Sequence, residues 1–181
     1  MNGPDRKIIL EDGQEYYGYS FGSAKEKILE IVFNTSMVGY QEILSDPSYT
    51  DQAVVMTYPL IGNYGMAADD YETDRPTTGA LIVHEYNDEP SNFRTVNTLS
   101  DIMDMYDICG ISGVDTRKLN RSIRDLGSRK ALMTSTETSL SEGVKILECC
   151  NMPKNAVSRA SAVQSTCRCR TLPATRSPTK A

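Results

Sequence analysis

The periodic pattern of apolar residues in this 181-residue chain stops at about Asn151, and this break limits what the chain can fold into. From there on, Ser, Thr, Arg, Pro and Cys replace the apolar residues that a core requires. Such a segment cannot bury enough apolar surface to offset the roughly 1–2 kcal/mol that ordering each residue costs. We therefore expect one folded domain over residues 1–150 and a disordered or out-of-frame tail over residues 151–181.

The charge of the chain is divided at the same point. Residues 1–150 carry 13 Lys and Arg against 24 Asp and Glu, a net charge of −11, whereas residues 151–181 carry six basic residues and no acidic one. An acidic body argues against nucleic acid as the main partner, because phosphate contacts supply most of that affinity. No run approaches the roughly 18 apolar residues of a membrane-spanning helix, and Met1 to Arg6 is too polar for a signal peptide. We expect a cytoplasmic protein that binds neither nucleic acid nor membrane.

Apolar runs in the first half of the chain predict strands. Asp12-Gly13 lies between Lys7–Leu10 and Glu15–Gly18. Asp-Gly supplies the positive φ angles of a tight turn, so this stretch predicts a hairpin. Further runs rich in β-branched or apolar residues predict strands at 28–33, 53–58, 79–86 and 131–134.

Three later segments have helical spacing instead. Their N-caps are predicted at Thr98, Asp115 and Ser139, and the second helix is expected to cover Thr116–Leu126 and to end at Gly127. Strands that precede helices, rather than alternating strictly with them, indicate an α+β fold. We expect a mixed, mainly antiparallel β-sheet with helices packed on it.

Several long blocks of the sequence recur together in one known family. The chain closely resembles the N-terminal domain of the carbamoyl-phosphate synthetase small-subunit family from about Lys7 to Met133. The blocks that carry the resemblance are LEDGQEYYGYSFG (10–22), FNTSMVGYQEILSDPSY (33–49), TYPLIGNYG (57–65), PSNFR (90–94) and GISGVDTRKLNRSIRDLG (110–127).

The resemblance implies a swivelling β/β/α-type domain that docks onto a large, ATP-consuming subunit. In that family a second domain of the small subunit, a class I amidotransferase with Cys, His and Glu catalytic residues, releases ammonia from glutamine. The large subunit then makes carbamoyl phosphate for pyrimidine and arginine synthesis. No Gly-x-Cys-x-Gly elbow of such a domain occurs in the 181 residues. We therefore expect no catalytic residue, no cofactor and no glutamine hydrolysis by this chain, and glutamine binding only in an intact subunit.

Ser48 is the candidate binding residue. In the SDPSY part of the second block, the resemblance implies that Ser48 touches bound glutamine in the intact assembly. A purely structural interpretation is also open, because Asp46 followed by Pro47 is typical of a turn whose Asp side chain bonds the backbone two residues on.

The cysteines and the single histidine suggest an alternative function. Cys109 and His84 could form the nucleophile and base of a stand-alone thiol hydrolase, although a buried thiol and a structural imidazole explain them more simply. Metal binding is not expected, because the spacing of the remaining cysteines, Cys149, Cys150, Cys167 and Cys169, does not suit structural zinc. A third alternative is a regulatory fragment that binds the large subunit and competes with the complete small subunit.

The basic residues along Thr116–Leu126 predict a solvated helix face. Arg117 is the exception, because it lies in the first turn, where the helix dipole disfavours a cation. A carboxylate could hold it there, and a surface of the large subunit is one possible source.

Overall fold

The computed structural model describes residues 3–66, 72–73, 75–89 and 97–150. The tail expected at 151–181, with Cys167 and Cys169, and the PSNFR block lie outside these residues. Within the described part of the chain, no helix is long and apolar enough to cross a membrane.

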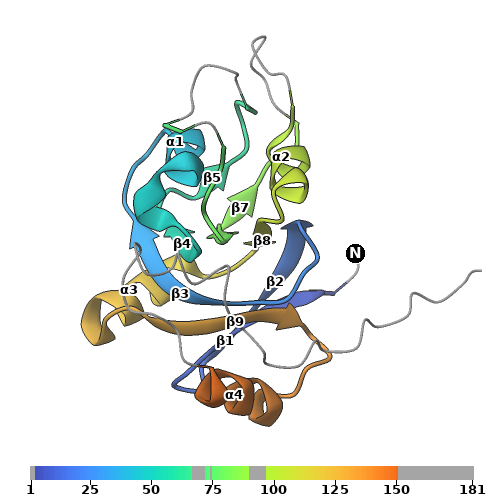
Figure 1. Ribbon diagram of the computed structural model, residues 1–181, viewed down its shortest axis with the longest axis vertical. Coiled ribbons are helices and arrows are strands. Elements are labelled where there is room, and N and C mark those ends of the chain that lie inside the picture. Colours follow the sequence, from blue (N-terminus) through green and yellow to red (C-terminus); the bar gives the residue numbers. More distant parts are fainter. Residues whose placement is uncertain (1–2, 67–71, 74, 90–96, 151–181) are drawn as a thin grey trace, which may run out of the picture.

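Seven strands close into a barrel in the order β1-β2-β8-β6-β4-β3-β9 (Figure 1). A separate pair, β5 and β7, forms a small two-stranded sheet beside it. The barrel strands are β1 (Arg6–Leu10), β2 (Glu15–Gly22), β3 (Lys27–Asn34), β4 (Gln52–Met56), β6 (Ala80–Ile82), β8 (Cys109–Ser112) and β9 (Arg129–Ser135), and the pair is β5 (Leu60–Ile61) with β7 (Glu85–Tyr86).

The strand directions confirm the mixed α+β fold but not the expectation of a mainly antiparallel sheet. Four pairings among the described strands are antiparallel, namely β1–β2, β1–β9, β2–β8 and β3–β9. The other four, β3–β4, β4–β6, β6–β8 and β5–β7, are parallel. Parallel neighbours require long crossover connections. The apolar pattern of a single strand does not show which strand it pairs with or in which direction, so the parallel pairings were not predicted.

The helices occupy three sides of the barrel. In Figure 1, α1 (Tyr40–Ser45), the 3-10 turn η1 (Pro47–Tyr49) and α2 (Leu99–Met105) lie at one end, together with β5 and β7. Helix α4 (Leu140–Cys149) lies at the opposite end, against β1 and β9, and α3 (Thr116–Leu126) packs at the side, against β3 and β4.

Two large apolar clusters account for most of the packing. The first fills the barrel with side chains from every barrel strand, including Ile8, Ile31, Val55, Ile82 and Ile111, all at 0% exposure. The second lies between the barrel wall and the elements at the α1–α2 end, around Tyr40, Leu44, Leu81 and Met103. Burial at about 25 cal/mol per Å² of apolar surface makes these clusters the main source of stability.

The predicted helix starts are confirmed. Thr98 and Asp101 form a capping box at α2, the Asp115 carboxylate accepts from the amide of Lys118 at α3, and the Ser139 hydroxyl accepts from the amide of Glu142 at α4. Helix α1 and strand β8 were not predicted. The strand predicted at 79–86 is divided into β6 and β7, because the strand is interrupted at Val83 and the chain bends at His84.

The barrel closes tightly where β2 passes β8. Gly18 is buried in β2, and a Cβ atom there would lie 2.2 Å from the carbonyl oxygen of Ser112 and 2.8 Å from Cγ1 of Ile111. A side chain at this position would therefore force the two strands apart.

We expect Gly18→Ala to lower the free energy of unfolding by about 1–3 kcal/mol, because overpacking a fixed interior strains the backbone. Urea denaturation followed by circular dichroism measures the effect. Gly3→Ala is the matched control, because a Cβ atom at Gly3 has nothing within 4 Å. Equal stability of the two variants would contradict the close approach of the strands.

Candidate functional site

A groove of about 380 Å³ opens beside α1 and η1. All but one of its lining residues come from the FNTSMVGYQEILSDPSY block, and the exception, Glu72, comes from a separate part of the chain. The lining residues are Asn34, Ser36, Val38, Gly39, Glu42, Ile43, Asp46, Tyr49 and Glu72. The block therefore folds around one concave surface.

The start of α1 depends on a tyrosine from a different block. Gly39, the N-cap residue, has a φ of 83° and supplies no side chain to cap the helix. Instead, the hydroxyl of Tyr64 accepts from the amides of Gly39 (2.9 Å) and Tyr40 (3.1 Å). The unpaired amides of a helix start need such an acceptor. The TYPLIGNYG block thus holds one wall of the groove in place.

The same two tyrosines also pack face to face. The rings of Tyr40 and Tyr64 stack with their centroids 4.2 Å apart, and the Tyr40 hydroxyl donates to the carbonyl oxygen of Gly65 (2.7 Å). Burial raises the pKa of Tyr40 well above its usual range, so the hydroxyl remains a donor.

Ser48 lies on the exposed side of η1, between two residues that line the groove. Its amide donates to Oδ1 of Asp46 (2.8 Å), and the 3-10 turn begins at Pro47, so the turn predicted from the sequence is confirmed. The hydroxyl of Tyr49 accepts from Nδ2 of Asn34 (3.0 Å), which ties this turn to the end of β3. Ser48 itself is not among the residues that line the groove, although its chain neighbours Asp46 and Tyr49 are.

The groove is acidic. Three carboxylates line it, those of Glu42, Asp46 and Glu72, and no Lys or Arg is among the lining residues. The amide of Glu72 donates to the Ser45 hydroxyl (2.9 Å), and this bond brings the second segment to the groove. Such a surface is complementary to an ammonium group or to other hydrogen-bond donors. The described residues include no cluster of three or more His, Cys, Asp or Glu side chains that could hold a metal ion.

Cys109 and His84 do not form a catalytic pair. Cys109 is fully buried among the side chains that fill the barrel, whereas His84 is exposed and donates from Nδ1 to the carbonyl oxygen of Val114 (3.0 Å). Cys109 is paired in register with Ala80, four residues before His84. At about 3.3 Å per strand residue, this offset separates the two side chains by on the order of 10 Å.

The electrostatics of the Cys109 thiol also differ from those of a nucleophile. Burial raises the pKa of Cys109, although the Arg6 guanidinium partly opposes that effect. The Cys109 thiol donates to the carbonyl oxygen of Lys25 (3.1 Å). A reactive cysteine instead needs a lowered pKa and access to solvent.

A second groove, of about 390 Å³ and mainly apolar, lies between β3 and α3. It is lined by Val32, Phe33, Ile123, Arg124 and Ser128. This groove was not predicted, because its two sides come from segments far apart in the chain.

Comparison with known proteins identifies the family. Residues 8–133 match the family described as "Carbamoyl-phosphate synthase small chain, CPSase domain". The chain belongs to this family. The resemblance noted in the sequence is thereby confirmed, and the matched residues include every residue that lines either groove.

Curated carbamoyl phosphate synthase small chains are similar over most of the chain. The small chain of Oceanobacillus iheyensis is 46% identical over 159 residues, which are 88% of this chain and 43% of that protein. That of Staphylococcus saprophyticus is 47% identical over 156 residues, 86% of this chain and 43% of that protein. The pyrimidine-specific small chain of Bacillus subtilis is 46% identical over 157 residues, which are 87% of this chain and 43% of that protein. The chain therefore spans less than half the length of these relatives.

Among solved structures, an aminopeptidase from Aneurinibacillus sp. strain AM-1 aligns with 74% of this chain and 31% of its own. The TM-score of 0.41 and the identity of 14% are too low to indicate a shared fold.

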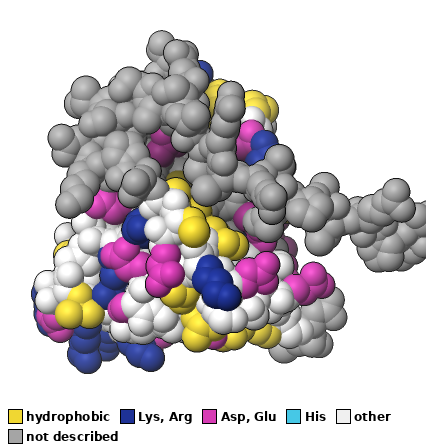
Figure 2. Space-filling model, turned by 60° about the horizontal axis from the view of Figure 1, so that its bottom comes forward, with side chains coloured by type: hydrophobic (Ala, Val, Ile, Leu, Met, Phe, Trp, Pro, Cys, Tyr) yellow, Lys and Arg dark blue, Asp and Glu magenta, His cyan; other side chains and the backbone are white. Residues whose placement is uncertain are grey.

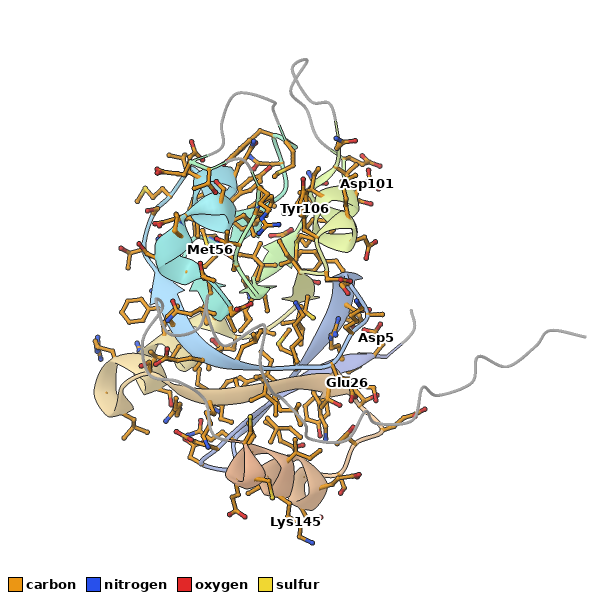
Figure 3. The ribbon with its side chains drawn as sticks, viewed as in Figure 1. Asp5, Glu26, Met56, Asp101, Tyr106 and Lys145 are labelled. Atoms are coloured by element: carbon orange, nitrogen blue, oxygen red, sulfur yellow. The ribbon has the colours of Figure 1, made fainter. Side chains whose placement is uncertain are left out.

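We expect Tyr64→Phe to destabilise the domain by about 1–3 kcal/mol, because it leaves two amides at the start of α1 without their acceptor. Thermal and urea unfolding measure the change. The control is Tyr106→Phe, which removes a hydroxyl from a ring that is 38% exposed at the end of α2 (Figure 3). If the two variants unfolded alike, the cap would have no role in stability.

Site-resolved alkylation tests the state of the thiols. In the native protein we expect iodoacetamide to modify the exposed Cys149 at least about tenfold faster than the buried Cys109, whose thiolate forms only at higher pH. In urea the two rates should become similar. Fast modification of native Cys109 near neutral pH would contradict its burial and favour the thiol-hydrolase alternative.

Proposed function

We propose that this chain acts as the N-terminal docking domain of the small, glutamine-using subunit of carbamoyl-phosphate synthetase. The observation that carries the proposal is the family match over residues 8–133, which coincides with the closed barrel and its surface grooves. In this proposal residues 1–150 form the domain, residues 151–181 form a separate tail, and the partner is the large subunit.

In the intact assembly, Ser48 contributes to the wall of the glutamine pocket. Its position in the chain between Asp46 and Tyr49, which both line the acidic groove, supports this role, because carboxylates suit the ammonium group of an amino acid and a serine hydroxyl can both donate and accept. A single hydroxyl contributes only about 1 kcal/mol, so most of the pocket must come from other parts of the assembly.

The whole enzyme would then supply ammonia from glutamine for carbamoyl phosphate, in the cytoplasm, for pyrimidine and arginine synthesis. The chain itself requires no cofactor for this role. It contributes a folded surface and one pocket residue, and the bond-breaking groups belong to the rest of the assembly.

Two other functions compete with this proposal. A stand-alone thiol hydrolase using Cys109 and His84 is disfavoured by the burial of the thiol and by the offset of the two residues. A regulatory fragment would bind the same large subunit but would displace the complete small subunit from it.

Binding to the purified cognate large subunit tests the docking role. We expect a stable complex by size-exclusion chromatography, because a specific interface buries about 800 Å² on each partner. We also expect no ammonia release from glutamine by the purified 181-residue chain. Absence of a complex would refute the docking role. Ammonia release that Cys109→Ala abolishes would establish the hydrolase instead, and displacement of the complete small subunit would establish the regulatory role.

A further inference from the structure

Helix α3 presents a stripe of arginines to solvent. Arg117, Arg121 and Arg124 are exposed and are spaced four and three residues apart, so they share one face of the helix. The opposite face is buried through Leu119 and Ile123. Figure 2 shows Lys and Arg side chains gathered at the left edge of the molecule, on the side where Figure 1 places α3.

The stripe is electrostatically unfavourable within the isolated domain. Like charges three and four residues apart repel each other on a helix, and Arg117 also lies in the first turn, where the dipole disfavours a cation and the nearby Asp115 carboxylate is engaged in capping the helix. Among the described residues, one carboxylate lies within ion-pair distance of these arginines. It belongs to Asp125, whose Oδ1 is 3.0 Å from Nε of Arg124. The described part of the domain therefore leaves most of this repulsion without compensation.

The stripe leads into the apolar groove between β3 and α3. Arg124 lines that groove together with Phe33, whose side chain is 37% exposed. Leu126, at the end of the same helix, is 66% exposed. An apolar centre bordered by charged groups is the usual composition of a protein–protein interface, and arginine and aromatic residues supply a large share of its affinity.

We propose that the α3 arginine stripe and the adjoining groove form the surface on which the large subunit docks. The partner presents carboxylates to Arg117, Arg121 and Arg124 and inserts an apolar side chain beside Phe33. This inference rests on the docking function proposed above and specifies the face that carries it. A nucleic acid is the weaker candidate, because it would leave the apolar groove unused and would approach a body with a net charge of −11.

Charge reversal on the stripe provides the test. We expect Arg121→Glu to weaken binding to the purified cognate large subunit at least about tenfold and to reduce its dependence on ionic strength. Phe33→Ala should weaken binding as well, without changing that dependence. Isothermal titration calorimetry at low and at physiological ionic strength measures both quantities.

Lys145→Glu is the matched control, because it makes the same change in charge at an exposed position on α4 (Figure 3). It should change the affinity by no more than about twofold. The thermal midpoint of each variant verifies folding, and Arg121→Gln replaces Arg121→Glu if the latter unfolds.

The possible failures can be told apart. If Arg121→Glu and Phe33→Ala bind as well as the unaltered chain, the docking face is wrong while the docking function stands. If Lys145→Glu weakened binding as much as Arg121→Glu, binding would depend on net charge alone, and the inference would also be overturned. If the unaltered chain does not bind the large subunit, the inference and the docking function fall together. Tight binding of a single-stranded oligonucleotide that Arg121→Glu abolishes would assign the stripe to nucleic acid instead.

Discussion

The closure of the sheet by β9 is the constraint on which the rest of the structure depends. This strand pairs with β1 on one side, where Arg6 lies opposite Ser135, and with β3 on the other. Because β1 and β9 come from opposite ends of the folded sequence, nearly the whole domain must be in place before the ring is complete. Closure leaves no barrel strand with an unpaired edge, and it fixes the direction in which β3 leaves the ring toward α1.

Both candidate surfaces meet at the end of β3. Phe33 lines the apolar groove against α3, and the next residue, Asn34, lines the acidic groove and bonds the Tyr49 hydroxyl. The proposed docking face and the proposed glutamine wall are therefore one residue apart on the same strand. A partner that shifted this strand end would disturb the η1 turn that carries Ser48.

Sequence reasoning succeeded where the signal was local. The first hairpin, the capped starts of α2, α3 and α4, and the turn at Asp46 each depend on residues a few positions apart. It failed where the cause was distant. Helix α1 begins at a glycine and depends on the hydroxyl of Tyr64, and the parallel pairings depend on crossovers. Ser48 was predicted from the family resemblance alone, whereas Glu72 was missed because only folding brings it to the acidic groove.

The packing of the barrel interior also determines whether a small molecule could pass through the barrel. Ile8, Ile31, Val55, Ile82 and Ile111 are wholly shielded from solvent and fill the ring with hydrocarbon side chains. Interiors packed to this density leave little room even for a water molecule. This barrel is thus a solid support rather than a channel, and a small molecule would have to pass around it.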